Sequence, residues 1–475
     1  MSRCPHPEAP PVGRACTHLL VGDHDEIEVF TGVGIVSEWS CRPCATANEH
    51  GAVVDVGAAC MAIVRDQGFE GIAGEPETIV MPSSIQARHE QVALACPALV
   101  DLQPVTGEDR ERWIGLAADG AVYELDIATR AVRALGRASH VDPTQPLALF
   151  VSRGARFIAV ANRHGTHGVV IERATWRTTI EITRDGYHTE HCAFSLAFID
   201  RDGRTLVVYA AKWNRLELAD ATTGELASAR DPITYERGAP APAHYLDYFH
   251  CGLAVSPGQR TIADAGWVWA PVGLVSAWSV DGWLANPYES EDGPSLQRLG
   301  QRAYFWDGPM AWLDDRRLLL WGYGEDDEWL IPAAVIRDTH TGEIERWFAG
   351  VPRGELWFDR WLHAATGLAL TVWDVERGAR LVEVPSAVTR YHPDAKCFAT
   401  IPVTGVITLV RLAGHDASWR TGTIDALVTR GDPDDLPILG DALEAAGYTD
   451  EEVLVHCRRP GAHAGRCWVF DRFAR

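Results

Sequence analysis

Cysteine and histidine residues are concentrated near the start of the chain, with a spacing that suits a metal ion. They form three close pairs: Cys4-Pro-His6, Cys16-Thr-His18 and Cys41-Arg-Pro-Cys44. Structural zinc takes four tetrahedral nitrogen and sulfur ligands, and two close pairs can supply them without leaving an open position. We therefore expect a structural Zn²⁺ site whose ligands are Cys16, His18, Cys41 and Cys44. Cys4 and His6 are an alternative pair, and a cysteine-rich tail without metal is the competing interpretation.

The residues between these pairs indicate how the ligands would be positioned. The run EIEVFTGVGIVSEWS predicts a β-hairpin that turns at Thr31-Gly32, and ATANEH after Cys44 predicts the first turn of a helix. A ligand pair, a hairpin and a CxxC at a helix start follow one another in treble-clef zinc sites. The next run, VVDVGAACMAIVRDQ, has the apolar spacing of a helix that leads out of this module. The predicted module and its helix cover residues 1–66.

Further histidines and cysteines recur in three later segments. These segments are HGTH with His164 and His167, HTEHC with His188, His191 and Cys192, and HYLDYFHC with His244, His250 and Cys251. If the three segments met on one face, their side chains could bind a metal or act as acid and base. The alternative is that each histidine forms hydrogen bonds within its own part of the fold. The sequence has no nucleophile elbow, no Gly-rich phosphate loop and no HExxH, so it does not favour an enzyme.

Tryptophan is the other biased residue type. Twelve of the eighteen tryptophans lie between Trp267 and Trp373. Trp278 and Trp373 occupy predicted strands, whereas three are predicted in loops: Trp283, Trp306 and Trp329. Trp329 follows an acidic run, and indoles beside carboxylates could recognise a cationic or carbohydrate ligand. Packing between sheets, with a solvated acidic loop, is the alternative.

The elements that must carry these residues are short strands. Leu196–Leu226 contains three β-prone runs joined by turns, the first at Arg-Asp-Gly, with a further turn at Thr-Thr-Gly-Glu that leads into a fourth. Similar units start near residues 99, 147, 196, 253, 311, 361 and 390. The starts are 48–58 residues apart except for the last interval of 29, which suggests a minimal sixth unit or a miscount. This period predicts a mainly β fold, a seven-bladed β-propeller.

The inner segments LAVSPGQRTIA and LAFIDRDGRTLVV resemble those of bacterial WD-repeat propellers over about residues 97–412. Most units lack the paired Gly-His and Trp-Asp signatures of that family, and Trp373-Asp374 is the clear Trp-Asp. The resemblance implies a rigid platform for protein interactions. Propellers protect their strand edges by sharing one blade between both chain ends. We therefore expect Glu75–Val80, or a neighbouring stretch before residue 97, to complete the seventh blade, within a propeller domain of residues 75–415.

The C-terminal residues 421–475 have a helical character. LPILGDALEAA and EEVLVHCRR predict two helices, the second with a capping box at Thr449 and Glu452. The run ALEAAGYTDEEVLVHCRRPGAHAGRCWV resembles a short tail found on diverse, mostly uncharacterised bacterial proteins. His456, Cys457, His463 and Cys467 have ligand-like spacing. A packing role for Cys457 and Trp468 in a small helical core is the favoured interpretation.

Composition limits the function classes. The 475 residues are 47% hydrophobic with a net charge of −22, which argues against a nucleic-acid binder because phosphates require a basic face. An apolar run of eighteen residues and a secretory signal are both missing, so we expect a cytoplasmic protein whose eleven cysteines are thiols or metal ligands. The sequence favours a non-enzymatic scaffold that binds a protein partner through one propeller face. The alternative is a metal- or carbohydrate-handling enzyme or binder.

Overall fold

The computed structural model describes residues 11–16, 27–31, 37–41, 53–57, 78–80, 83, 85–231, 233, 235, 240–269, 271–327, 330–413, 422–445, 451–458 and 467–473. The chain divides into two units, Met1–Met81 with His89–Val410 and Pro82–Arg88 with Arg411–Arg475. None of the helices in the described ranges is long and apolar enough to cross a bilayer.

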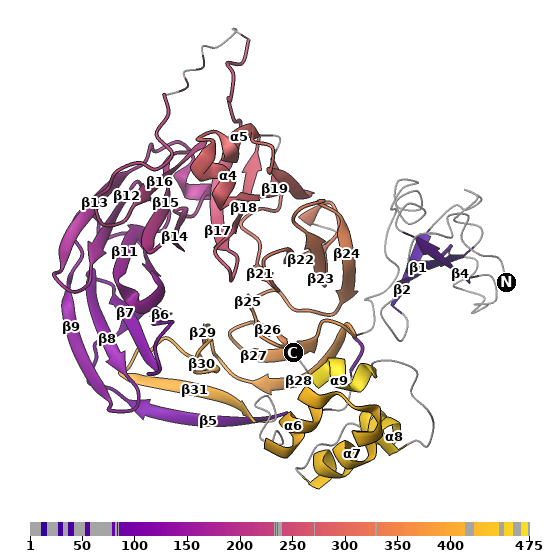
Figure 1. The fold of residues 1–475 in the computed structure, drawn as a ribbon. Helices are drawn as coiled ribbons and strands as arrows, with labels where there is room; N and C mark the ends of the chain where they lie inside the picture. Colours follow the sequence, from indigo (N-terminus) through magenta and orange to yellow (C-terminus); the bar gives the residue numbers. More distant parts are fainter. Residues whose placement is uncertain are drawn as a thin grey trace. The chain divides into compact units, whose positions relative to one another are not determined.

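Seven antiparallel sheets follow one another along the chain, and Figure 1 shows them arranged in a ring. The predicted mainly β, seven-bladed propeller is therefore confirmed. The first three blades contain β6 (Leu99–Pro104), β7 (Arg112–Ala117), β8 (Ala121–Asp126) and β9 (Ala131–Arg137); β10 (Leu147–Val151), β11 (Phe157–Asn162), β12 (His167–Glu172) and β13 (Arg177–Thr183); and β14 (Leu196–Arg201), β15 (Arg204–Lys212) and β16 (Arg215–Asp220).

The remaining blades have four strands each. They contain β17 (Phe249–Val255), β18 (Thr261–Val268), β19 (Val272–Ser279) and β20 (Gln297–Ala303); β21 (Met310–Trp312), β22 (Arg317–Tyr323), β23 (Ile331–Asp338) and β24 (Ile344–Ala349); β25 (Glu355–Phe358), β26 (Leu362–Ala365), β27 (Ala369–Asp374) and β28 (Ala379–Pro385); and β29 (Arg390–His392), β30 (Cys397–Ala399), β31 (Val406–Ala413) and β5 (Gln86–Ala93). The sixth blade is complete and starts at Glu355, so the predicted start near residue 361 took its second strand as its first. The corrected interval from Glu355 to Arg390 is 35 residues and is still the shortest.

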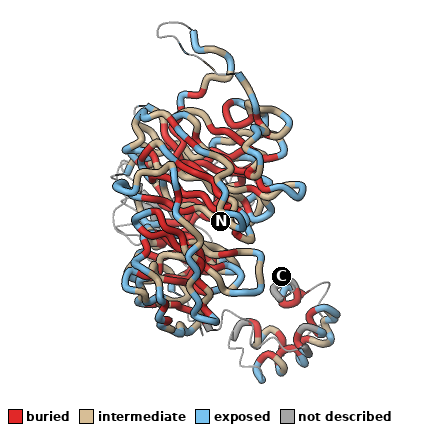
Figure 2. Tube along the Cα trace, turned by 90° about the vertical axis from the view of Figure 1, so that its left-hand side faces the viewer, coloured by how far each residue is buried: buried red, intermediate tan, exposed pale blue. Residues whose placement is uncertain are grey.

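The strands form where the sequence alternates apolar runs with turn residues. Asp202 and Gly203 join β14 to β15, and both have positive φ angles of 50° and 74°. Arg201 pairs directly with Arg204, so this is a two-residue hairpin whose left-handed turn fits the twist of the strands. Figure 2 shows the result: the strand interiors of the blades are buried and the connecting turns are exposed.

An aspartate at the end of the third strand stabilises the next turn in several blades. The Asp220 carboxylate accepts hydrogen bonds from the backbone N–H groups of Thr222 and Thr223, at 2.8 and 3.2 Å. Asp338 and Asp374 repeat this arrangement in the fifth and sixth blades. The aspartate that ends the third strand is therefore an Asx-type turn former that satisfies backbone donors.

The third blade differs from the prediction because it has three strands. Among the described residues between β16 and β17, an isolated bridge between Ala219 and Leu226 takes the place of the expected fourth strand. Side chains satisfy the exposed edge of β16: Ser228 Oγ accepts from the Leu218 N–H at 3.1 Å, and the Arg230 guanidinium donates to the Leu216 carbonyl at 2.9 Å. This satisfied edge offers less backbone for pairing with another chain.

The fourth blade carries two short helices between its third and fourth strands. Helices α4 (Val280–Ala285) and α5 (Glu289–Asp292) lie between β19 and β20. Ser279 caps α4 by accepting a hydrogen bond from the Gly282 N–H at 3.1 Å. Trp283, predicted in a loop, lies in α4 and is completely buried against Trp278. The cap at Ser279 starts the helix, and the helix places the Trp283 side chain in the core.

Closure of the ring uses residues that precede the first blade. Strand β5 pairs next to β31 as the outer strand of the seventh blade. The prediction that a stretch before residue 97 completes this blade is confirmed, by Gln86–Ala93 in place of Glu75–Val80. Val80 instead forms a parallel bridge with Arg380 of the sixth blade.

The N-terminal sheet has the order β2-β3-β1-β4, with β1 (Pro11–Cys16), β2 (Ile27–Thr31), β3 (Ser37–Cys41) and β4 (Val53–Gly57). The hairpin predicted around Thr31-Gly32 is confirmed because β2 and β3 pair antiparallel. The helix predicted from Val53 is wrong at its start, since Val53–Gly57 is a strand paired with β1. Three β-branched valines in this short run favour a strand, and the apolar spacing alone did not separate the two.

The unit that contains the C-terminal residues has a helical core. Its helices are α6 (Gly422–Arg430), the 3₁₀ turn η5 (Pro433–Asp435), α7 (Leu436–Ala445), α8 (Glu451–Arg458) and α9 (Trp468–Phe473). The two predicted helices correspond to α7 and α8, whereas α6 and α9 were not predicted. Leu439, Val453 and Phe470 are completely buried in this core.

A buried ion pair joins the seventh blade to the first, and we predict that the fold depends on it. Asp101 is 2% exposed, and its carboxylate accepts hydrogen bonds from Arg390 at 2.6 Å and from the Leu149 N–H at 3.0 Å. Replacing Asp101 by Ala leaves Arg390 without its charge partner. We expect the free energy of unfolding in urea to fall by about 3 kcal/mol.

Glu383→Ala is the matched control, since Glu383 and Arg380 form an exposed pair. Its loss should change the free energy of unfolding by less than about 1 kcal/mol. Equal effects of the two substitutions would contradict the role assigned to Asp101.

Candidate functional site

Aromatic side chains from three blades meet at one end of the propeller sheets. We call this group the aromatic face; its members are Tyr187, His188, Trp213, Phe249, Trp267, Trp269 and Trp306. They come from the β13–β14 connection, the β15–β16 turn, the start of β17, the end of β18 with the β18–β19 turn, and the β20–β21 connection. In a four-stranded antiparallel blade, the second turn and the connection to the next blade lie at the same end. The topology therefore gathers residues that are far apart in the sequence.

A stacked core supports this face. The rings of Phe249 and Trp267 stack with centroids 4.1 Å apart, and Trp306 stacks on Trp267 at 5.1 Å. Phe249 is fully buried and Trp267 is 3% exposed. The rings in the inner layer are thus fixed by packing, which keeps the outer rings in place.

Two aromatic rings of the face are open to solvent. Tyr187 is 46% exposed and Trp269 is 47% exposed. Tyr187 packs edge-on against Trp213 at 5.5 Å, and Trp269 packs edge-on against His188 at 4.9 Å. Large exposed rings held by buried neighbours are typical of binding surfaces, because little side-chain entropy is lost on binding.

Polar groups beneath the face hold its loops. The buried Arg184 guanidinium donates to the carbonyls of Gly165 at 2.8 Å and Cys192 at 2.9 Å. These bonds tie the β13–β14 connection to a turn of the second blade. His250 Nδ1 lies 2.5 Å from the Asp264 carboxylate, and both side chains are buried. The pair secures the start of β17 to β18.

Two buried thiols lie at the base of the aromatic face. A hydrogen bond from Cys251, together with one from Trp267 Nε1 at 3.1 Å, lowers the pKa of Cys192 despite its burial. The pKa of Cys251 is raised, because it donates to Cys192 and is buried. Both cysteines are thiols in the structure. This arrangement explains the Cys residues of HTEHC and HYLDYFHC as packing and hydrogen-bonding groups.

The histidines expected to converge have separate environments. His250 is paired with Asp264, His244 stacks on Tyr288 at 3.9 Å, and His164 is exposed at the β11–β12 turn. The one convergent group with metal-ligand chemistry among the described residues is His188, Glu190 and His191. The interpretation that each histidine is satisfied locally thus holds for His244 and His250.

The tryptophans of the fourth to sixth blades are mainly packing residues. Trp278 and Trp373 are buried strand residues, as predicted. Trp306 lies in the β20–β21 connection, as expected, and Trp329 lies outside the described residues. Next to Trp306, Arg353 lies over the rings of Phe305 and Trp321, at 5.0 and 5.6 Å from their centroids. The protein's own cation therefore already occupies these rings.

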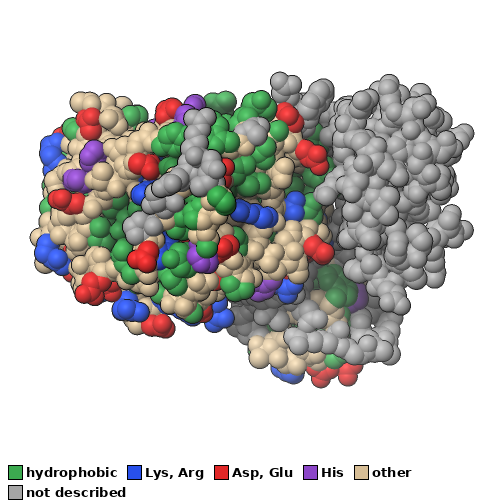
Figure 3. All heavy atoms as spheres, turned by 90° about the horizontal axis from the view of Figure 1, so that it is seen from above, with side chains coloured by type: hydrophobic (Ala, Val, Ile, Leu, Met, Phe, Trp, Pro, Cys, Tyr) green, Lys and Arg blue, Asp and Glu red, His purple; other side chains and the backbone are tan. Residues whose placement is uncertain are grey.

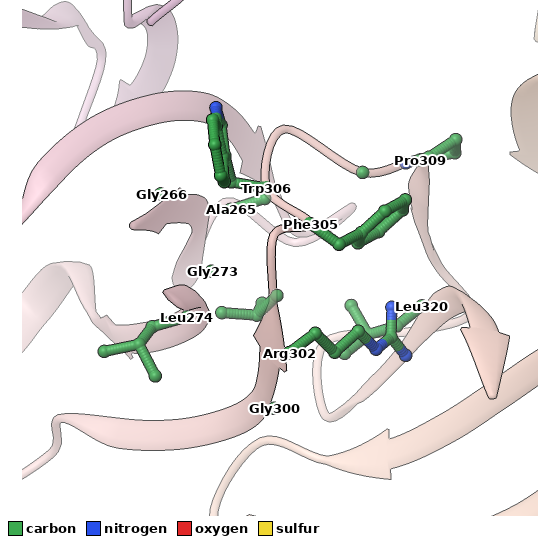
Figure 4. A pocket seen from close by; sticks show the side chains of 12 residues that line it. Ala265, Gly266, Gly273, Leu274, Gly300, Arg302, Phe305, Trp306, Pro309 and Leu320 are labelled. Atoms are coloured by element: carbon green, nitrogen blue, oxygen red, sulfur yellow. The ribbon is translucent and has the colours of Figure 1, made fainter. Parts of the chain in front are cut away.

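Cavities around Trp306 are small. Figure 4 shows one between the fourth and fifth blades, lined by Gly266, Gly273, Phe305 and Trp306 among others. Its volume is ≈ 20 Å³, which is room for about one water molecule. A more open hollow next to it, with Asp327 and Arg353 in its wall, measures ≈ 200 Å³. Enclosed small-molecule sites usually start near about 300 Å³, so these hollows favour surface contacts.

Charge around the aromatic face includes exposed carboxylates. Glu190 and Asp247 are both exposed. Glu190 forms a hydrogen bond with His188, and Asp247 interacts electrostatically with Tyr245. The side of the molecule seen in Figure 3 has acidic and basic side chains interspersed. The whole chain still carries an excess of 22 negative charges, so its long-range field attracts cationic partners.

Two of the four predicted zinc ligands belong to the described N-terminal sheet. Cys16 ends β1 and Cys41 ends β3, and these strands are parallel neighbours in the register Ala15 to Trp39. The two cysteine positions therefore lie at the same end of adjacent strands. His18 and Cys44, and the alternative pair Cys4 and His6, lie outside the described residues.

The two ligand-like cysteines of the helical unit are buried in its core. Cys457 is 1% exposed in its core, and Trp468 Nε1 donates to His456 Nδ1 at 3.3 Å. His456 Nε2 lies 3.1 Å from Cys467 Sγ. His463 lies outside the described residues. The packing role expected of Cys457 is confirmed, whereas the one expected of Trp468 is wrong, because Trp468 is 39% exposed and its ring contacts His456.

Several residues of the aromatic face were not singled out from the sequence. Tyr187, Trp213, Phe249 and Trp269 lie in four different segments, and each is an ordinary aromatic residue at a strand end. The signal that could have found them was the position of each next to a turn on the same end of a blade. That signal requires the strand assignment of every blade.

Comparisons with known proteins give a fold-level similarity. No protein-family model and no curated protein matches this sequence. Among solved structures, a chain of the "Crystal Structure of Mitotic Checkpoint Complex" is similar with a TM-score of 0.45 and 13% identity. The match covers 72% of the present chain and 98% of that chain. A similarity of this size carries no conclusion about the partners of the present chain.

Cys457 allows a prediction of pH dependence. Burial raises its pKa to about 11 from an ordinary value of 9.0. The unfolded chain therefore releases this proton at a lower pH than the folded chain does. We expect the free energy of unfolding of the helical unit to fall as pH rises from about 9 to 11.

The Cys457→Ala variant should lose this part of the alkaline dependence. The measurement is urea unfolding followed by far-ultraviolet circular dichroism at several pH values. An unchanged slope between pH 9 and 11 in the variant would contradict the assignment.

Proposed function

We propose that the protein is a non-enzymatic scaffold that binds a protein partner through the aromatic face. The observation that carries the proposal is the pair of solvent-exposed rings, Tyr187 and Trp269, held by a fully packed aromatic layer. Aromatic residues at the centre of an interface contribute most of its binding energy when their neighbours fix them. The shallow hollows next to Trp306 suit a surface contact with a macromolecule.

The partner segment is expected to contain lysine or arginine. Exposed carboxylates lie beside the rings, and the chain carries a large negative charge. Ring faces attract cations at short range, while net charge accelerates the encounter. Binding should therefore weaken as the salt concentration rises.

The double substitution Tyr187→Ala and Trp269→Ala tests this proposal. A partner isolated on the wild-type protein from its native host would be purified and titrated against both proteins by calorimetry. We expect the dissociation constant to rise at least about tenfold, since a hot-spot residue contributes about 2 kcal/mol.

Leu368→Ala is the control for this experiment. Leu368 is 84% exposed in the sixth blade, so its removal tests for nonspecific loss of apolar surface. Binding should be unchanged in this variant. A purified partner that binds the double variant as tightly as the wild type would contradict the proposal.

The proposal also includes a structural zinc site in the N-terminal module. Its ligands are Cys16, His18, Cys41 and Cys44, with Cys4 and His6 as the alternative pair. The placement of Cys16 and Cys41 at the same end of adjacent strands supports this site. Four nitrogen and sulfur ligands suit zinc, which would hold the small sheet together.

We predict one equivalent of zinc in the freshly purified protein that is bound by these cysteines. The Cys41→Ser/Cys44→Ser variant should lose it, as measured by inductively coupled plasma mass spectrometry. Cys96→Ser is a matched control because Cys96 is a thiol in the seventh-blade region. Zinc content that is equal in the wild type and the Cys41/Cys44 variant would contradict the site.

A further inference from the structure

The β13–β14 connection contains a compact group of three metal-ligating side chains. His188, Glu190 and His191 lie at or within a single 3₁₀ turn, Thr189–His191. Glu190 Oε1 is 3.2 Å from His188 Nδ1 and 3.6 Å from His191 Nε2. All three ligand atoms lie within 4.8 Å of one another. The three groups are partly exposed, so an ion from solution can reach them.

These separations match the size of a small divalent ion. Zinc binds imidazole nitrogen and carboxylate oxygen at about 2.0–2.2 Å, so ligands in a tetrahedral shell are about 3.3 Å apart. The two nitrogen–oxygen distances are already close to this value. The nitrogen–nitrogen distance needs only a modest rotation of exposed side chains. Two histidines and one carboxylate also bind first-row transition ions in preference to Mg²⁺ or Ca²⁺.

The aromatic face holds the His188 ring and the His191 backbone in place. Trp306 Nε1 donates a hydrogen bond to the His191 carbonyl at 3.0 Å. The His188 ring packs edge-on against Trp269, at 4.9 Å, and against Phe249, at 5.9 Å. Fixed ligands bind metals more tightly, because less freedom is lost on coordination.

The other described histidines with a carboxylate neighbour lack this convergence. His250 is buried with Asp264, His244 pairs with Asp292, His140 with Glu181 and His363 with Asp359. At His188 and His191 two imidazoles share one carboxylate at the surface. A hydrogen-bonding role for the Glu190 carboxylate alone would need only one of these two imidazoles.

We propose that His188, Glu190 and His191 bind one divalent transition-metal ion of the zinc type on the aromatic face. Three protein ligands leave at least one coordination position for an outside group. That position is next to Trp269, on the surface proposed to bind the partner. The ion would thus supply a further contact point, but its binding does not depend on the partner and can be measured without it.

Zinc titration of the full chain tests the proposal. Protein dialysed against a weak chelator would be titrated with Zn²⁺ by calorimetry, with the zinc retained from purification counted separately. The wild type should take up one more equivalent than the His188→Ala/His191→Ala variant. Glu190→Gln keeps the shape of the side chain and removes its charge, and should weaken this binding at least about tenfold.

A spectroscopic readout locates the ion. Bound Cu²⁺ quenches nearby tryptophans, so it should quench the emission of the wild type, and Trp269→Phe should reduce the amplitude of quenching. The double variant His140→Ala/His167→Ala is the matched control, because these histidines form a ring contact outside the proposed site. It should bind zinc as the wild type does.

Three outcomes would overturn the proposal. These are wild-type protein that takes up no added zinc, an equal uptake by the His188/His191 variant, and an equal loss in the His140/His167 control. Because the Cys41/Cys44 variant removes a different equivalent, failure of the N-terminal zinc site is distinguishable from failure of this one.

Discussion

Unpaired strand edges are the constraint on which this structure depends. The faces of each blade are covered by the neighbouring blades, so the last blade must meet the first. The outer edge of a blade also needs a strand to pair with its backbone groups. Strand β5 solves this by adding residues from before the first blade to the sheet of β29, β30 and β31.

Side chains secure the same seam. The Asp101 carboxylate accepts bonds from Arg390 of the seventh blade and from the backbone of β10 in the second. One buried group therefore contacts three consecutive blades. Both of its carboxylate oxygens accept hydrogen bonds, which offsets the cost of burying the charge.

The third blade shows a second solution to the same constraint. It lacks an outer strand, and Ser228 and Arg230 bind the backbone groups along β16 that such a strand would have bound. Arg230 is itself buried and needs a charge partner, which Glu291 of α5 supplies. The helical insertion of the fourth blade thus contributes to stabilising the edge of the third.

The repeats were predictable because their signals are local. A run such as LAFIDRDGRTLVV contains its own strand pattern and its own left-handed turn at Asp202-Gly203. The start of the sixth blade was missed because β25 has four residues and no turn glycine directly after it. Val53–Gly57 was assigned to a helix because a short apolar run fits both periodicities.

The aromatic face could not be predicted in the same way. Tyr187, Trp213 and Trp269 contact one another or a common ring only because the blades bring separate turns together. The sequence did identify HTEHC as chemically suited to metal binding. It assigned the convergence to histidines of three segments, whereas the structure places the ligand atoms within one. Local spacing was informative, and spatial grouping required the fold.

Burial separates the roles of similar residues in this chain. His250 and Cys251 are adjacent in sequence and completely enclosed, and their partners Asp264 and Cys192 are also buried. Such groups specify one arrangement of the core, because leaving either partner unsatisfied would be costly. His188 and His191 contact the same aromatic layer from its solvent side. The aromatic layer buries the inner residues. It therefore also holds the outer residues in place at the surface, where a ligand can reach them.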